Sequence, residues 1–357
     1  MNFDYSEEQQ LLADSLRRYL SAQYSFEQRK KAIDGSPEVW AKFAEMGLLA
    51  LPLSADYGGF GGGAVDLMGV MEAFGEELVV EPYLATVVAS RIVARAGIGA
   101  QKKALLPAVA EGRLKLAFAH TEAGARYDLT AVKCTAKKSG DHWLIEGEKK
   151  AVQGAPVADK LVVSARSPKG VGLFLADPVK GTTRRGLDGF PESDLVFSGT
   201  RAEALEGGLP EVEEAIDFAT ALICAEAIGA MKFSCDTTLE YLKTRKQFGV
   251  PIGTFQALQH RIVDMYIAHE QAKSMSCLAC SKIDSSGNAK ERARAISAAK
   301  IKIADTCRHV SQEAIQLHGG MGMTDEMKVS HTFKRLTMIA QQFGDAEHHL
   351  ARFAALS

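Results

Sequence analysis

Apolar residues recur at helical spacing through the N-terminal part of the chain. Leu16 and Leu20 follow this period, and Ser6 stands where a helix-capping side chain would precede them. A second helix is expected to begin near Ser36, because the proline that follows it suits the first helical turn. The pattern therefore predicts an N-terminal domain of helices over residues 1–113.

The period of the apolar residues changes to two in the middle of the chain. Between about Lys115 and Ala204, short apolar runs such as Leu116–Ala119 are separated by Gly, Asp, Pro and Ser turns, which is typical of strands. The sequence Ser139-Gly-Asp141 has the composition of a hairpin connection. We expect a middle β domain over residues 114–208.

Helical spacing returns after Pro210, and very few helix breakers interrupt it. Long helical segments with short joins are typical of an antiparallel bundle. Four such segments are readable, over about residues 211–246, 254–284, 288–318 and 325–355. The sequence thus predicts a multi-domain α+β protein with an N-terminal helical domain, a middle β domain and a C-terminal four-helix bundle over residues 209–357.

Composition narrows the functional classes. The 357 residues carry 42 Lys and Arg against 44 Asp and Glu, a net charge of −2, so no global basic field would attract nucleic acid or an anionic membrane. The hydrophobic share of 46% suits a globular enzyme and argues against long disorder. The N-terminus lacks the apolar core of a signal peptide, and no run of about 18 apolar residues predicts a membrane-spanning helix. We expect a cytoplasmic protein without membrane insertion.

Two groups of residues could suggest a metal site. Cys277 and Cys280 form a lone CxxC, without the second pair or nearby histidine that a zinc site needs. Glu347, His348 and His349 lie together near the C-terminus, but adjacent helical residues point about 100° apart and do not share a face. We expect no metal, and six cysteines that are structural thiols in a reducing compartment.

Five strings resemble the acyl-CoA dehydrogenase family in their order and spacing, over nearly the whole chain. They are Pro52-Leu-Ser-Ala-Asp-Tyr-Gly-Gly59 with Glu76-Glu77-Leu78; Leu106-Pro107 to Gly112; Ala119-His-Thr-Glu-Ala-Gly124; Thr244-Arg-Lys-Gln-Phe-Gly249 with Phe255-Gln256 and Gln259-His260; and Gln316-Leu-His-Gly-Gly-Met-Gly322. The resemblance implies the acyl-CoA dehydrogenase-like fold, FAD as cofactor and α,β-desaturation of an acyl-CoA thioester. It also implies an oligomer that holds each flavin across a subunit interface.

The resemblance places one group of FAD contacts near the start of the C-terminal domain. Arg245 would meet the diphosphate, for which a guanidinium fork is suited, although most such arginines are ordinary surface residues. Gln247 and Phe248 would line the ADP part of FAD, and Gln256 would contact its polar groups. Anion binding by this near-neutral protein would therefore be local.

Two further segments carry implied flavin contacts. Gln316, Gly319 and Gly320 would meet the FAD of a neighbouring subunit, because glycines let a ligand approach backbone N–H groups closely. The same glycines would also suit a helix C-cap, and the two roles are compatible. His120 and Thr121 fall where the family places its flavin-facing strand. A threonine hydroxyl there would donate to the pyrimidine edge of the flavin, although an ordinary strand threonine is the alternative.

Two positions near the expected flavin site depart from the family pattern. Ala151 stands where the family usually brings a Trp against the flavin, although Gln153 could still reach it. Tyr127 stands where a small serine usually meets both the flavin and a CoA phosphate, so it places bulk where a ligand would lie. These departures argue against an ordinary acyl-CoA site in this chain, whereas the segments expected to bind FAD are retained.

The base that desaturation requires is missing from both positions at which the family carries it. Removal of the α-proton needs a carboxylate. Ungapped counting from the neighbouring motifs puts Phe343 at the usual position and Thr220 at the alternative one, and neither side chain can abstract a proton. Asp345 would substitute only if the chain slipped by two residues. Glu226 is the first acid after Thr220 in the sequence, but it lies more than one helical turn away.

A subset of the family shows this combination of features. The chain resembles the base-lacking small subunits of heteromeric bacterial members, such as the small subunit of pimeloyl-CoA dehydrogenase. That resemblance implies an FAD-binding subunit of a homo- or hetero-oligomer, active with a paralogous partner that supplies the glutamate and whose pocket could hold the acyl-CoA. Two alternatives stay open. One is a self-sufficient flavoenzyme that uses Asp345 or chemistry without a base, and the other is a non-catalytic structural or regulatory paralogue.

Overall fold

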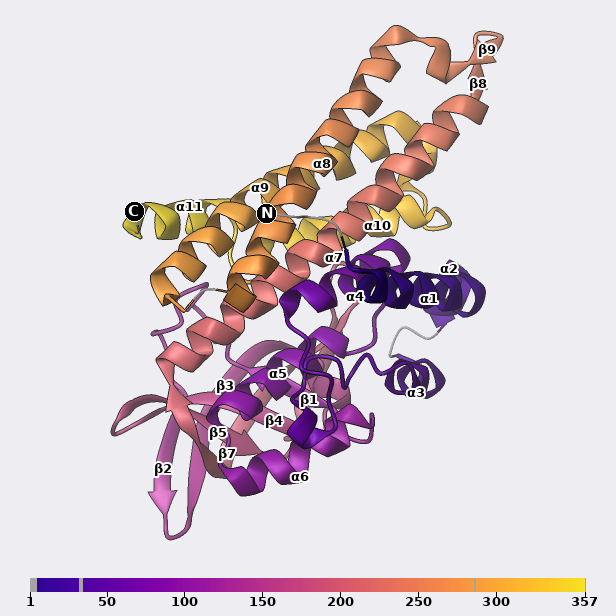
Figure 1. The fold of residues 1–357 in the computed structure, drawn as a ribbon. Helices are drawn as coiled ribbons and strands as arrows, with labels where there is room; N and C mark the ends of the chain where they lie inside the picture. Colours follow the sequence, from indigo (N-terminus) through magenta and orange to yellow (C-terminus); the bar gives the residue numbers. More distant parts are fainter. Residues whose placement is uncertain (1–4, 32–34, 286, 357) are drawn as a thin grey trace. The chain divides into compact units, whose positions relative to one another are not determined.

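The computed structural model describes residues 5–31, 35–285 and 287–356, which form two compact units. One unit consists of Met1–Lys31, Ala64–Val79 and Thr220–Ser357, and the other of Ala32–Gly63 and Val80–Ala219. Each unit is described by itself below, and Figure 1 shows the elements of both. The ranges of the three domains expected from the sequence stay predictions, because this division of the chain separates different residues.

The first unit is helical and is built largely from the C-terminal half of the chain. Its helices are α1 (Glu7–Gln23), α2 (Phe26–Lys31), α4 (Ala64–Glu77), most of α7 (Leu209–Thr244), α8 (Gln256–Ser285), α9 (Ala289–His318), α10 (Lys328–Gln341) and α11 (Ala346–Ala355). A hairpin of β8 (Lys246–Gln247) and β9 (Val250–Pro251), followed by the short helix η3 (Ile252–Thr254), joins α7 to α8 (Figure 1). The short helix η4 (Gly319–Met323) follows α9.

The helix caps expected near the N-terminus are present. The Ser6 hydroxyl accepts the backbone N–H of Gln9, and the Gln9 side chain accepts the N–H of Ser6, so both partners of a capping box are made. In the other unit, the Ser36 hydroxyl accepts the backbone N–H of Val39 at the start of α3 (Pro37–Glu45), and Pro37 lies in the first turn of that helix. These local signals were sufficient to locate the two helix starts.

Three of the four long helical segments expected after Pro210 are confirmed as α7, α8 and α9, and the fourth is wrong in one respect. The segment expected over residues 325–355 is two helices, α10 and α11, separated by a turn. Phe343 has φ 59 and Gly344 has φ 124 in that turn, and a left-handed residue cannot continue a right-handed helix. Apolar spacing continues across the turn, so periodicity alone did not show it.

The helical unit depends on close contact between α4 and α7. A Cβ atom at Gly75 would lie 1.9 Å from the backbone oxygen of Glu226, and one at Gly229 would lie 1.8 Å from that of Glu72, so only glycine fits. Helix α7 is also long and apolar enough to cross a membrane by length and composition. However, 89% of its most apolar window is buried inside the structure, as in the central helix of a bundle.

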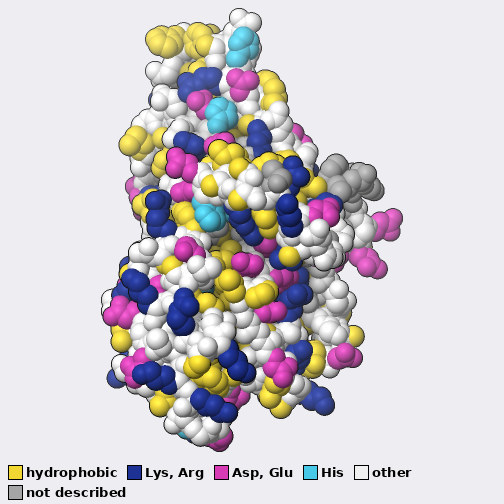
Figure 2. Space-filling view, turned by 90° about the vertical axis from the view of Figure 1, so that its left-hand side faces the viewer, with side chains coloured by type: hydrophobic (Ala, Val, Ile, Leu, Met, Phe, Trp, Pro, Cys, Tyr) yellow, Lys and Arg dark blue, Asp and Glu magenta, His cyan; other side chains and the backbone are white. Residues whose placement is uncertain are grey.

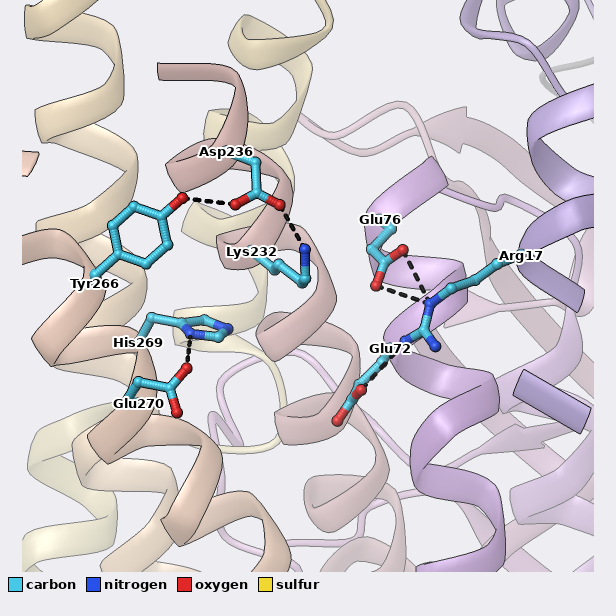
Figure 3. A network of polar contacts seen from close by, with 8 residues as sticks. All are labelled: Arg17, Glu72, Glu76, Lys232, Asp236, Tyr266, His269 and Glu270. Carbon is cyan, nitrogen blue, oxygen red and sulfur yellow. Dashed lines mark hydrogen bonds and ion pairs between the residues drawn. The ribbon is translucent and has the colours of Figure 1, made fainter. Parts of the chain in front are cut away.

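Polar side chains lie between the helices of this unit on both sides of α7 (Figure 3). On one side of the network Arg17 of α1 donates to Glu76 of α4 at 3.1 Å and forms an ion pair with Glu72 at 3.4 Å. On the other side of the network, the Tyr266 hydroxyl of α8 donates to Asp236 of α7 at 2.6 Å. The network also includes Lys232, His269 and Glu270. These contacts fix α1 against α4, and α8 against α7.

The second unit holds a sheet together with short helices. Its helices are α3, η1 (Ala55–Tyr57), α5 (Tyr83–Ala96), α6 (Gly99–Ala110) and η2 (Ala155–Val157). Its strands are β1 (Leu116–Ala119), β2 (Thr135–Ser139), β3 (His142–Gln153), β4 (Lys160–Ser167), β5 (Gly170–Ala176), β6 (Gly181–Arg185) and β7 (Pro191–Gly208). The strand order is β1-β4-β2-β3-β7-β5, with β6 on β7, and β4 also pairs with β5. Because β5 pairs with both β7 and β4, the sheet closes on itself around an apolar core.

The sequence located some strands of this sheet and missed others. The run Leu116–Ala119 is confirmed as β1, and the hairpin expected at Gly140 is confirmed, since Ser139 of β2 pairs with His142 of β3. Strands β6 and β7 were not recognised. Every residue of β6 is exposed, and the inward positions of β7 include the polar Ser193, so neither strand shows a clear apolar alternation.

The face of the molecule in Figure 2 shows Lys and Arg side chains interspersed with Asp and Glu. Basic side chains do not gather there into one continuous field. This agrees with the balanced charge of the sequence, and it leaves anion binding to local groups of residues.

Candidate functional site

In the β unit, His120 and Thr121 lie where the chain leaves β1. The Thr121 hydroxyl oxygen lies 3.2 Å from Nε2 of His120, and the imidazole stacks on Phe118 with 4.8 Å between ring centroids. Burial, and then the charge of Lys149, lower the pKa of His120 to about 4, so the ring is neutral at pH 7. Thr121 is half-buried in the β unit.

The segment Lys149–Gln153 of β3 lies beside Thr121. The Lys150 N–H donates to the Thr121 carbonyl at 2.9 Å. The pairing of β3 with β7 is irregular between Lys149 and Val152, and Ala151 has φ 51 there, while its N–H donates to Asp194 at 2.9 Å. Such a conformation costs about 1–3 kcal/mol in a non-glycine residue. The structure therefore brings the two expected flavin-facing segments of this unit together, and keeps a strained residue where the family has its Trp.

In the helical unit, four expected cofactor residues gather at the junction of α7 and α8 (Figure 1). Arg245 follows the last residue of α7, Gln247 and Phe248 belong to the β8–β9 hairpin, and Gln256 is the first residue of α8. Phe248 and the next residue have φ 53 and 81, the two left-handed positions of a tight hairpin turn. The Phe248 ring is 91% exposed, and the other three side chains are exposed as well.

The other expected cofactor residues of this unit lie where α9 ends. Gln316, Gly319 and Gly320 are exposed, and a Cβ atom at either glycine would meet nothing within 4 Å. The space beside these backbone atoms is therefore open. The His318 ring stacks on Tyr241 at 4.5 Å, and the Tyr241 carbonyl accepts the N–H of Arg245 at 2.8 Å. The end of α9 thus lies next to the last turns of α7.

The donors at these positions fit the cofactor that the sequence implies. An exposed guanidinium at Arg245 suits an anionic diphosphate, and exposed amides suit the polar edges of a nucleotide. Open backbone at Gly319 and Gly320 adds room for close approach by phosphate or ribose oxygens. The exposed Phe248 ring provides an apolar surface beside them. The roles of the individual residues stay predictions.

The two family positions for the base hold side chains without acid–base chemistry in the structure as well. Thr220 lies within α7 and is buried, and Phe343 lies in the turn between α10 and α11. Glu226, the first acid after Thr220 in the sequence, accepts two hydrogen bonds from the Arg335 guanidinium, at 2.5 Å from Nε and 2.8 Å from Nη2. Both partners are buried, so the Glu226 carboxylate is committed to an ion pair between α7 and α10.

The turn that carries Phe343 is held from several sides. One Asp345 oxygen accepts the His348 N–H at 2.8 Å and caps α11, which argues against a slip that would make Asp345 the base. Nε2 of His349 lies 3.1 Å from the Phe343 carbonyl, and its Nδ1 lies 3.2 Å from the Ser297 hydroxyl. Burial, and then the charge of Lys300, lower the pKa of His349 to about 3. A neutral ring with its proton on Nε2 satisfies both contacts.

Sequence reasoning missed the buried charged residues around these segments. Lys149 is fully buried and forms an ion pair with the buried Glu122 at 2.8 Å. Arg335 is the partner of Glu226, and the ammonium of the buried Lys300 donates to the Ile339 carbonyl. The available signal was a charged residue inside an apolar run, but such a residue gives no indication of its partner.

The residues suggested for metal binding have other surroundings in the structure. All six cysteines are buried free thiols, and burial raises the pKa of each one. His349 points into the contacts with Ser297 and Phe343 described above. Within residues 5–31, 35–285 and 287–356, no group of three or more His, Cys, Asp or Glu side chains is arranged to hold a metal ion.

Three family models match the chain in sequence order. The model described as acyl-CoA dehydrogenase, N-terminal domain, matches residues 6–113, the middle-domain model matches residues 117–199, and the C-terminal-domain model matches residues 206–355. Among curated proteins, the acyl-CoA dehydrogenase FadE12 of Mycobacterium tuberculosis is 30% identical over 365 residues, which cover 95% of this chain and 93% of that protein.

Two solved structures share the fold over nearly the whole chain. A variant of the steroid ACAD Tcur3481-Tcur3483 superposes with a TM-score of 0.90 at 30% identity, covering 98% of this chain and 97% of that one. The ChsE4-ChsE5 complex of Mycobacterium tuberculosis superposes with a TM-score of 0.92 at 23% identity, covering 99% and 98%. The second likeness shows the fold alone.

Proposed function

Because this chain belongs to the acyl-CoA dehydrogenase family, whose members are FAD-dependent oxidoreductases acting on CH–CH bonds, we propose that it is an FAD-binding subunit that works with a paralogous partner carrying the catalytic glutamate. The observation that carries the proposal is the loss of the base. Phe343 and Thr220 occupy its two family positions, and the nearby carboxylates of Glu226 and Asp345 are engaged in an ion pair and a helix cap.

The chemistry divides between the two subunits. Bound FAD supplies the hydride acceptor for desaturation, and a carboxylate must remove the α-proton of the thioester. In the helical unit Arg245, with the amides around it, would hold the diphosphate of a flavin, and in the β unit the Thr121 hydroxyl would meet the edge of a flavin. The partner subunit would supply the carboxylate. This chain therefore completes a cofactor site and leaves proton abstraction to its partner.

The exposed cofactor residues support a site that a second chain completes. The Phe248 ring is 91% exposed at the α7–α8 junction, three residues after the exposed Arg245, and the backbone at Gly319 of the same unit is open as well. An apolar ring in water is expected to be covered by a ligand or another chain. A structural neighbour at 30% identity carries two protein names, Tcur3481-Tcur3483, which supports a heteromer as the proposed assembly.

The substrate class follows from the family, and its location from Tyr127. The Tyr127 side chain is half-buried, and the Arg126 guanidinium lies 5.9 Å from the centre of its ring. A tyrosine there fills space that the family leaves to a serine and a CoA phosphate. We therefore place the acyl-CoA thioester, of the fatty-acid or dicarboxylate β-oxidation type, in the partner's pocket.

Anaerobic mixing with acyl-CoA tests the proposal. The chain is produced alone and together with a glutamate-bearing paralogue, and the visible absorption band of the flavin is followed. We expect bleaching by acyl-CoA only when the partner is present, and no bleaching when the partner's glutamate is replaced by glutamine. Bleaching in the isolated chain would contradict the proposal and favour a self-sufficient enzyme. A flavin-free complex would favour a structural paralogue.

A further inference from the structure

The end of β1 is held by an unusual set of contacts. The ladder between β1 and β4 stops at the pair Ala119 and Val163, so His120 and Ser164 are the next residues on the two strands. The Lys149 ammonium of β3 lies between these two residues. It donates to the His120 carbonyl at 3.1 Å and to the Ser164 hydroxyl at 3.1 Å, where the next ladder bonds would form.

The same ammonium also fixes Glu122. It donates to Oε1 of Glu122 at 2.8 Å, and the Glu122 carboxylate accepts the backbone N–H groups of Lys133 at 2.7 Å and Cys134 at 3.1 Å. Those two residues directly precede β2. One buried ion pair therefore joins the end of β1 to the start of β2 and to the facing residues of β3 and β4.

Three successive residues are held in this way. Lys149 holds the carbonyl of His120 and the carboxylate of Glu122, and the Lys150 N–H holds the carbonyl of Thr121 between them. A buried ion pair is a weak source of stability, because apolar side chains of similar size can replace it without loss. A precise conformation of the 120–122 segment is a better explanation for its presence.

We propose that Lys149 is a positioning residue, which through Glu122 and Ser164 holds His120 and Thr121 in the conformation that meets the flavin. The proposal rests on the assignment of FAD to this chain. It adds a reason why the flavin-facing segment keeps its shape after it leaves the sheet. It also makes Lys149, whose ammonium is held by His120, Glu122 and Ser164, a determinant of flavin binding and of the flavin's electronic environment.

Three variants and a matched control test the role. Lys149→Met removes the ammonium, and Glu122→Gln with Lys149→Met removes both charges so that neither is left buried alone. Ser164→Ala removes one acceptor and preserves the pair. Lys160→Met is the control, because Lys160 forms a half-exposed ion pair with Asp177 on the same sheet. All are studied in the full chain, with the partner subunit where flavin binding requires it.

Hydrogen exchange of the apoprotein measures positioning without the flavin. We expect faster exchange of the amides of Lys133, Cys134 and Lys150 in Lys149→Met and in the double variant, and unchanged exchange in Lys160→Met. With FAD added, we expect at least a tenfold loss of FAD affinity and a shifted flavin absorption band in the same two variants. Ser164→Ala should show smaller changes in the same direction.

The outcome that overturns the proposal is a folded double variant with unchanged amide exchange and with the FAD affinity and spectrum of the parent protein. If the double variant does not fold, Ser164→Ala provides the test instead. Unchanged amide exchange and unchanged flavin properties in Ser164→Ala would then overturn the proposal equally. A parent protein that binds no FAD, alone or with its partner, would instead refute the proposed function. The amide exchange of the apoprotein would still report on the positioning of residues 120–122.

Discussion

The ion pair between Glu226 and Arg335 makes a prediction that separates structure from catalysis. Glu226 is the first acid after Thr220 in the sequence, so it is a carboxylate that a search along α7 for a replacement base would consider. In the structure its two oxygens accept Nε and Nη2 of Arg335 at 2.5 and 2.8 Å, and the side chains are only 5% and 1% exposed. Glu226→Gln would leave the guanidinium charge buried without its counter-charge.

The expected cost is large. Removing one partner of a buried ion pair costs about 3–5 kcal/mol, because the remaining charge stays desolvated without compensation. That corresponds to a factor of about 10² to 10⁴ in the unfolding equilibrium constant. A typical domain is stable by only about 5–15 kcal/mol, so Glu226→Gln should remove a large part of the stability of the helical unit. A free catalytic carboxylate would behave oppositely, because neutralising an unpaired buried charge is neutral or stabilising.

Urea unfolding at one protomer concentration measures this cost, since the stability of an oligomer depends on concentration. Glu240→Gln is the matched control, because Glu240 pairs with Lys243 at the surface and should cost less than about 1 kcal/mol. Adding Arg335→Met to Glu226→Gln should restore most of the lost stability. If Glu226→Gln unfolds within about 1 kcal/mol of the parent protein, the ion pair does not have the role assigned to it.

Three further predictions concern the cofactor, the missing base and pH. Arg245→Gln should weaken FAD binding about 10- to 100-fold, since a hydrogen bond to a charged group contributes about 1.5–3 kcal/mol. Because the side chain is exposed, the unfolding free energy should stay within about 0.5 kcal/mol of the parent value. Flavin titration measures the first effect and urea unfolding the second. With Phe343→Glu alone, the flavin should stay oxidised when acyl-CoA is added, and adding Tyr127→Ser should permit bleaching. Bleaching in the single variant would show that the acyl-CoA pocket is intact. The pKa of His349 is about 3, below the ordinary histidine value of 6.5. The contribution of the buried neutral ring to the folding free energy is therefore complete above pH 6.5 and is lost as the pH falls toward 3. The stability difference between the parent protein and His349→Asn should therefore shrink on acidification by up to about 1.4 kcal/mol per pH unit, and a difference independent of pH would contradict the burial of a neutral ring.

Local signals in the sequence were sufficient for much of the fold. Ser6 indicated a helix start because a cap is made by residues three positions apart, Pro37 indicated another because proline suits the first helical turn, and the Gly140 hairpin depends on one turn. The family strings were informative because each combines a turn or helix end with a ligand contact. Such features are contained in a few neighbouring residues, so they can be read without knowledge of the tertiary structure.

Long-range contacts were not predictable in the same way. The partner of Glu226 lies 109 residues away, and nothing near Glu226 indicates it. Lys149 and Lys150 are identical neighbours, yet the first is fully buried and the second is 32% exposed, because successive residues of a strand point to opposite faces. The break at Phe343 follows a backbone conformation that apolar spacing does not encode. The ion pairs that bear on the candidate site therefore emerged only from the structure.

The number of flavins per chain in the purified complex tests the central claim most directly. The chain is co-purified with its glutamate-bearing paralogue, the bound flavin is released and quantified, and both subunits are counted. A site completed by two different subunits predicts one FAD for each pair of chains. One FAD for every chain would contradict the account, because each subunit would then hold a complete cofactor site of its own.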